Sequence, residues 1–105
     1  MKKIDKPWGH EEVLLEDYCL VKRLVLHDET STHYHVQRNE VLIPVSGSGV
    51  IVLGNNTVSL QPLVPVFVPV GTVHRIVPHT SLVIIEVSDK NIDDVVRVSD
   101  KHHRV

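Results

Sequence analysis

Three histidines and one glutamate in this chain have the types and spacing of metal ligands. His33 and His35 are two residues apart, a spacing that on a β-strand places both imidazoles on one face, about 7 Å apart. Glu40 follows after four residues, enough chain to turn and return beside that strand, and His74 comes soon after a proline–glycine turn signal. Three neutral imidazoles and one carboxylate suit a divalent zinc, iron, manganese, nickel or cobalt ion. They leave one or two coordination positions for water or substrate.

A single histidine on a strand is more often a hydrogen-bonded structural residue, so a metal-free pocket stays the alternative to this site. The combination of two histidines on one strand, a glutamate at a short offset and a later histidine after a turn favours the metal. Spacing and ligand type agree independently in that combination.

Short β-strands are the elements that must position these four residues. Valine dominates the apolar residues and alanine is absent, a composition that favours strands over helices. Short apolar runs between glycine, proline and asparagine turn signals recur at a regular spacing typical of an all-β sandwich or barrel. The predicted strands are Glu12–Leu15, Cys19–Leu26, Thr32–Val36, Glu40–Val45, Val50–Leu53, Asn56–Leu60, Val64–Val68, Thr72–Val77 and Leu82–Val87.

A length of 105 residues predicts one domain over residues 1–105, with an N-terminal arm (1–10) and a polar C-terminal tail (89–105) that could hold a helical turn or a short strand. The formal net charge of -2 argues against nucleic acid and membrane surfaces as main partners. The sequence contains no run of about 18 apolar residues, the length that a membrane-spanning helix needs, so no segment is expected to span a bilayer. A single cysteine, Cys19, excludes a disulfide framework, and the absence of a signal-peptide pattern makes the cytoplasm the expected compartment.

Two segments carry the proposed ligands. The first runs from Thr32 to Glu40 and is followed by six residues and Gly47, and the second is Pro69-Val70-Gly71-Thr72-Val73-His74. They resemble the two motifs of the cupin superfamily. The resemblance implies a cupin jelly roll, or double-stranded β-helix barrel, with the metal in the barrel mouth. It also implies that the family's four metal ligands correspond to His33, His35, Glu40 and His74.

Five further segments lie, in order, at Lys6-Pro7-Trp8-Gly9, Val21–Leu24, His74-Arg75, Asp93–Arg97 and Asp100–Arg104. Together they resemble the cupin domain of type II mannose-6-phosphate isomerases. This resemblance implies a metal-dependent enzyme that acts on a small-molecule sugar phosphate by aldose–ketose isomerisation. The same family has a glutamine where this chain has His33.

An isomerase of this kind moves a proton between C1 and C2 of the sugar and binds a phosphate, so it needs a base and cationic groups. Glu86 is a candidate base, because a carboxyl in the apolar run Leu82–Val87 is costly to bury unless it is paired or functional. Tyr34 is the other candidate. The cationic candidates are Lys22, Arg75, Arg38 and Arg97.

Trp8, the only tryptophan, is expected to anchor the N-terminal arm against the barrel. An arm of this kind often packs on a second protomer and covers a sheet edge, so we expect a homodimer. Two other functions compete with the isomerase. One is a non-catalytic cupin module that binds a small molecule or carbohydrate, since 105 residues leave few elaborated loops. The other is an iron-dependent dioxygenase, because cupins with this ligand set also activate oxygen.

Overall fold

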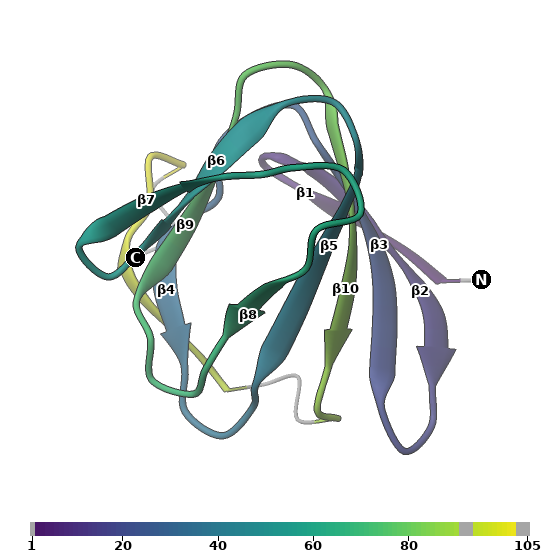
Figure 1. Ribbon diagram of the computed structural model, residues 1–105. Coiled ribbons are helices and arrows are strands. Elements are labelled where there is room, and N and C mark those ends of the chain that lie inside the picture. The colour runs from purple at the N-terminus through teal and green to yellow at the C-terminus, as the bar shows by residue number, and fades with distance from the viewer. Residues whose placement is uncertain (1, 91–93, 103–105) are drawn as a thin grey trace.

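Two antiparallel sheets face each other in the computed structural model, which describes residues 2–90 and 94–102 (Figure 1). One sheet has the strand order β1 (Lys2–Lys6), β2 (Gly9–Glu16), β3 (Leu20–Leu26), β10 (Leu82–Ser88), β5 (Glu40–Ser46) and β8 (Val66–Val68). The other has the order β11 (Val95–Ser99), β4 (Thr32–His35), β9 (His74–Pro78), β6 (Gly49–Leu53) and β7 (Asn56–Ser59). Within these described ranges no helix is long and apolar enough to cross a membrane.

The prediction of an all-β fold is confirmed, and each of the nine predicted strands has a counterpart among β2 to β10. Two more strands lie outside these nine. β1 was not predicted: it lies in the segment expected to be an arm, and it pairs with β2 of its own sheet. β11 lies in the expected tail, for which a helical turn or a short strand was left open, and it pairs with β4. Neither segment has a long apolar alternation of its own, so its strand conformation depends on the neighbouring strand that it pairs with.

The inner faces of the strands change from apolar to charged along the barrel. On β10, Leu82 and Ile84 are fully buried, and the next inward residue is Glu86. On β3 the buried residues Leu24 and Leu26 likewise share a face with Lys22. The apolar end forms the core, which consists of Trp8, Leu24, Leu26, Leu42, Ile51, Leu60, Val68, Ile76, Leu82 and Ile84. The charged end of the same faces is therefore left to line a site.

Two of the hairpin turns depend on glycine for different reasons. Gly47, between β5 and β6, has a φ of 86°, and a Cβ placed on it would lie 2.0 Å from the carbonyl oxygen of Ser81. Gly54, between β6 and β7, has a φ of 56°, but a Cβ there would meet no atom within 4 Å. Gly47 therefore needs both the left-handed conformation and the missing side chain, whereas Gly54 needs only the conformation.

The two glycines make a matched pair of stability predictions. Gly54→Ala should lower the free energy of unfolding by about 1–2 kcal/mol, the cost of a left-handed L-residue. Gly47→Ala should lower it by roughly 3–5 kcal/mol, because a backbone clash is added to that strain. Urea unfolding of the two variants measures both losses. Equal losses would show that the Ser81 carbonyl does not constrain the turn.

Candidate metal centre

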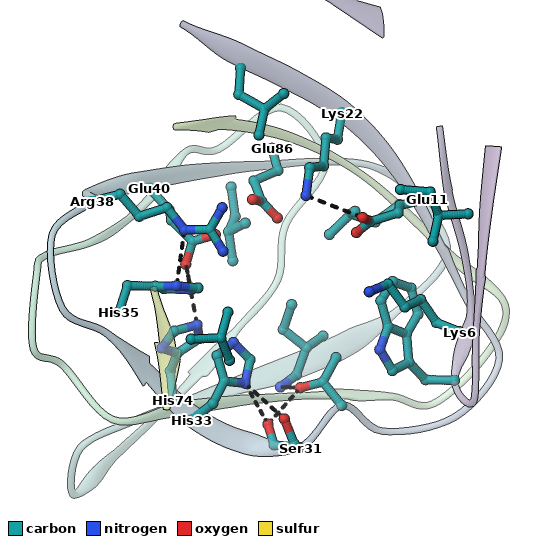
Figure 2. A pocket seen from close by; sticks show the side chains of 18 of the residues that line it. Lys6, Glu11, Lys22, Ser31, His33, His35, Arg38, Glu40, His74 and Glu86 are labelled. Carbon is teal, nitrogen blue, oxygen red and sulfur yellow. Dashed lines mark hydrogen bonds and ion pairs between the residues drawn. The ribbon is translucent and has the colours of Figure 1, made fainter. Parts of the chain in front are cut away.

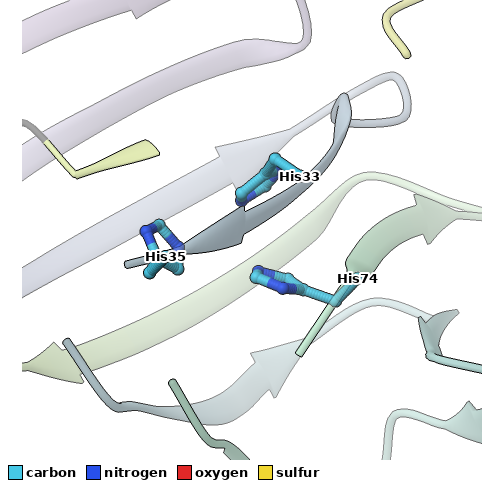
Figure 3. Close-up of side chains that lie close together, drawn as sticks. All are labelled: His33, His35 and His74. Carbon is cyan, nitrogen blue, oxygen red and sulfur yellow. The ribbon is translucent and has the colours of Figure 1, made fainter. Parts of the chain in front are cut away.

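Three imidazoles converge from two neighbouring strands of the smaller sheet (Figure 3). His33 and His35 project from the same face of β4, as the alternation of a strand requires, and His74 of β9 is the register partner of His33. The ring centroids are 4.3 Å apart for His33 and His74, 5.1 Å for His33 and His35, and 5.4 Å for His35 and His74. One nitrogen of each ring lies within 4.8 Å of the others, so the three histidines could hold a metal ion.

A carboxylate from the opposite sheet meets these rings. Glu40 is the first residue of β5, and the loop 36–39 carries the chain across to it from β4. Its Oε1 lies 2.6 Å from His35 Nε2 and 3.3 Å from His74 Nε2. Glu40, His35 and His74 are each 3% exposed, so three of the four predicted ligands are almost closed to solvent.

The atoms that converge there have no hydrogen-bond partner of their own. Within the described residues, His35 Nε2 and Glu40 Oε1 are both buried, and neither makes a hydrogen bond despite the short distance between them. Buried polar atoms are usually satisfied, and an exception calls for an explanation such as an ion. Imidazole nitrogens and a carboxylate oxygen are the ligands that divalent transition metals prefer, so these residues fit such an ion.

The second nitrogens of two histidines are already occupied by the backbone. His33 Nδ1 lies 2.9 Å from the carbonyl oxygen of Ser31, and His74 Nδ1 lies 2.9 Å from that of Thr72. A carbonyl oxygen only accepts, so each Nδ1 carries the proton and donates it. The Nε2 of each ring is left as a lone pair, the form in which a histidine binds a metal.

His35 has two competing partners at its Nδ1. Arg38 Nε lies 2.9 Å away and could donate to it, while Asp94 Oδ1 lies 3.3 Å away and could accept from it. Only the form that donates from Nδ1 to Asp94 leaves Nε2 free to bind an ion. In that form Arg38 Nε can donate to Asp94 Oδ1, at 3.0 Å.

Burial and close contacts shift the protonation of the site. Burial, together with the nearby His74, lowers the pKa of His33 to about 3, so its ring is neutral at pH 7. Burial raises the pKa of Glu40, but contacts with His35, His74 and Glu86 outweigh it and leave that pKa far below its usual range. Burial and the neighbouring Glu40 carboxylate raise the pKa of Glu86 well above its usual range. Of these two carboxyls, Glu40 therefore ionises the more readily, and Glu86 keeps its proton to a higher pH.

A cavity of about 260 Å³ opens from these residues between the two sheets (Figure 2). The histidines and Glu40 line one side. Glu86 and Lys22 line another, and Lys22 Nζ lies 3.2 Å from Glu11 Oε1. Lys6 of β1 faces the same space from the far side. The cavity therefore combines three histidines that could hold a metal ion, a carboxyl with a raised pKa and several cations.

The structure places the three predicted catalytic residues differently. Glu86 and Lys22 line the cavity and are 7% and 8% exposed. Arg75 does not line it, because it follows His74 directly on β9 and so points to the opposite face, where it lies 3.7 Å from Glu29. Tyr34, the other candidate base, is also absent from the lining.

Two residues that support the site were not predicted from the sequence. Glu11 pairs with Lys22, a contact that depends on the register between β2 and β3. Asp94 contacts His35 and Arg38 from 56 or more positions away, and no local pattern indicates that contact. His10 and His27 contact Glu12 and Ser81 and lie outside the cavity lining.

Several solved structures share this fold at low sequence identity. Capsular polysaccharide assembling protein CapF from Staphylococcus aureus superposes with a TM-score of 0.82 and 22% identity, over 93% of this chain and 31% of that one. KdgF from Halomonas sp. has a TM-score of 0.80 and 16% identity, over 90% of this chain and 92% of that one. A variant of Streptomyces PAC13 with uridine has a TM-score of 0.82 and 18% identity, over 94% and 85%. The chain thus spans about a third of CapF, and these likenesses establish a cupin fold.

Sequence comparison adds a family to the fold. No curated protein matches the chain significantly. The family model described as mannose-6-phosphate isomerase C-terminal matches residues 1–100, which is nearly the whole sequence. This chain therefore belongs to the mannose-6-phosphate isomerase C-terminal family of cupin domains.

Proposed function

We propose that this protein is a metal-dependent enzyme that interconverts the aldose and ketose forms of a sugar phosphate. The observation that carries the proposal is that His35 Nε2 and Glu40 Oε1, both buried and 2.6 Å apart, converge with His33 and His74 at one point. These four residues would hold a divalent zinc, manganese, nickel or iron ion. When bound, such an ion supplies Lewis acidity that polarises the carbonyl oxygen of an open-chain sugar. The family membership supports the choice of substrate.

The reaction needs no co-reactant. One proton moves from C2 to C1 and one from O2 to O1, so atoms and electrons balance within the substrate. We assign the proton transfers to Glu86, because it faces the cavity beside Glu40 and its pKa is raised by burial and by the Glu40 carboxylate. It donates its proton to the carbonyl oxygen O1, and the carboxylate that forms takes the proton from C2. It then returns that proton to C1 and takes the proton of O2, so Glu86 ends in its starting form.

Lys22 is assigned to substrate binding. Its side chain is buried, and its Nζ is held by Glu11 at 3.2 Å while it faces the cavity near Glu86 (Figure 2). A lysine fixed in this way offers its remaining N–H donors to a hydroxyl or phosphate oxygen. Arg75 is left out of the proposed site because it lies on the outer face of its strand.

Metal binding should depend on the clustered histidines His33, His35 and His74 and not on the number of histidines in the chain. Tag-free protein should take up about one divalent ion per chain. His74→Gln should weaken its affinity more than the roughly 10–100-fold that loss of an outer partner costs. His79→Gln, a change at an exposed histidine, is the matched control and should bind like the parent protein.

Isothermal titration and elemental analysis measure both the stoichiometry and the affinity. Uptake below about 0.2 ion per chain in the parent protein would contradict the four-ligand site. Equal affinities of the two variants would contradict it as well.

Turnover should depend on Glu86 as well as on the bound metal ion. Protein loaded with zinc, manganese, nickel or iron is expected to convert mannose 6-phosphate to fructose 6-phosphate. Glu86→Gln should lower kcat by about 10²–10⁴-fold, since it removes the transferable proton. Glu12→Gln alters a carboxylate that pairs with Arg23 outside the cavity, and it should leave kcat unchanged.

Elemental analysis measures the metal content of Glu86→Gln. An unchanged metal content would show that the lower kcat comes from the lost proton donor and not from a lost ion. Absence of turnover with all four metals would make this substrate wrong. If the loaded protein then bound the sugar phosphate unchanged, a binding module would replace the enzyme as the proposed function.

We also propose that the protein is a cytoplasmic homodimer. The N-terminal strand pairs within its own sheet and Trp8 is buried in its own core, so the arm does not itself support a dimer. Support comes from the outer strand β8, where Phe67 is 58% exposed. Analytical ultracentrifugation should find twice the chain mass for the parent protein and the 11.8 kDa chain mass for Phe67→Glu. A parent mass of 11.8 kDa would contradict the dimer.

A further inference from the structure

Two arginines face the cavity with nitrogen atoms that nothing in the described part of the chain satisfies. Arg38 is 4% exposed, and its Nη1 is buried without a hydrogen-bond partner. Arg97 is half-buried, and its Nε is in the same state. Both line the cavity. Neither Glu86 nor Lys22, which the proposed reaction uses, satisfies these atoms.

Their positions relative to the histidines are set by the fold. Arg97 on β11 is the register partner of His33, so the two side chains leave the sheet on the same face as direct cross-strand neighbours. Arg38 reaches the cluster from the loop after β4, and its Nε lies 2.9 Å from His35 Nδ1. The two guanidinium groups therefore adjoin the two histidines of β4, one each.

The framework holds Arg38 while leaving one side of its guanidinium open. Asp94 Oδ1 lies 3.0 Å from Arg38 Nε, and Asp94 Oδ2 accepts from the Arg38 backbone N–H at 3.0 Å. These contacts fix the group in place without using Nη1. A buried N–H of a charged group that stays unpaired costs free energy, so a partner of opposite charge is expected to complete it.

We propose that Arg38 and Arg97 bind an oxyanion of the substrate, a carboxylate or a phosphate, directly beside the histidine cluster. A guanidinium presents several N–H donors in a fixed plane, which matches the paired oxygens of either group better than an ammonium does. The proposal rests on the proposed function only in that the histidines mark the reacting end of the substrate. It adds that the charged group of the substrate folds back to, or is attached near, that end.

The experiment uses metal-free protein, so its outcome does not depend on metal binding. Inorganic phosphate and glycolate, the simplest probes of the two anion types, are titrated separately at constant ionic strength. The Arg97 Nε–H signal is followed in ¹H–¹⁵N spectra. Either probe should move that signal to saturation, and the tighter of the two identifies the anion type of the substrate.

Variants of two arginines in the same sheet test the assignment. Arg97→Gln should weaken binding of the tighter probe by about tenfold or more, the usual effect of losing one charge-assisted hydrogen bond. Arg75→Gln removes the same charge from the outer face and should leave binding unchanged. Arg97→Lys keeps the charge but not the planar donors, and it should also weaken binding, which separates hydrogen bonding from charge alone.

Two results would overturn the proposal: no saturable shift with either probe, or equal affinities of Arg97→Gln and Arg75→Gln. Metal is then added to the same samples, and its uptake distinguishes a missing oxyanion site from a missing metal site. A protein that binds metal but neither anion lacks the oxyanion site, and a protein that binds an anion but no metal lacks the catalytic centre.

Discussion

The geometry of the site depends on the contacts that the Asp94 carboxylate makes with His35, Gln37 and Arg38. One oxygen accepts from the backbone N–H groups of Gln37 and Arg38, and the other lies near Arg38 Nε and His35 Nδ1. Burial raises the pKa of Asp94, but these hydrogen bonds and the charge of Arg38 outweigh it and lower that pKa. An ionised carboxylate thus joins the start of β11 to β4 and to the loop that leads to Glu40.

The two sheets contribute different chemistry to the cavity. The smaller sheet supplies the three imidazoles, and the larger sheet supplies Glu40, Glu86 and Lys22. Glu40 and Glu86 lie two register positions apart on the paired strands β5 and β10, so both carboxyls project into one buried region. Two such groups cannot both ionise there, and the imidazoles decide which one does. One environment therefore lowers the pKa of Glu40 and raises the pKa of Glu86.

The relatives share the barrel, and a barrel alone does not specify a reaction. At identities of 16–22%, the structural matches establish the fold but say nothing about which residues line the cavity. In this chain the lining is set by the point at which each strand changes from apolar to charged on its inner face. Ile84 and Glu86 illustrate this on β10, where one step of two residues crosses from the core to the site.

The sequence alone determined what depends on local periodicity. The two-residue spacing of His33 and His35 put them on one face, and the turn signals located nine strands, because a strand alternates its side chains with a period of two. Only the tertiary structure decided which face looks inward and which strands become neighbours. It put Arg75 outside, set Arg97 opposite His33 and brought Asp94 to Arg38. Strand order and register join distant segments, and no local pattern carries that information.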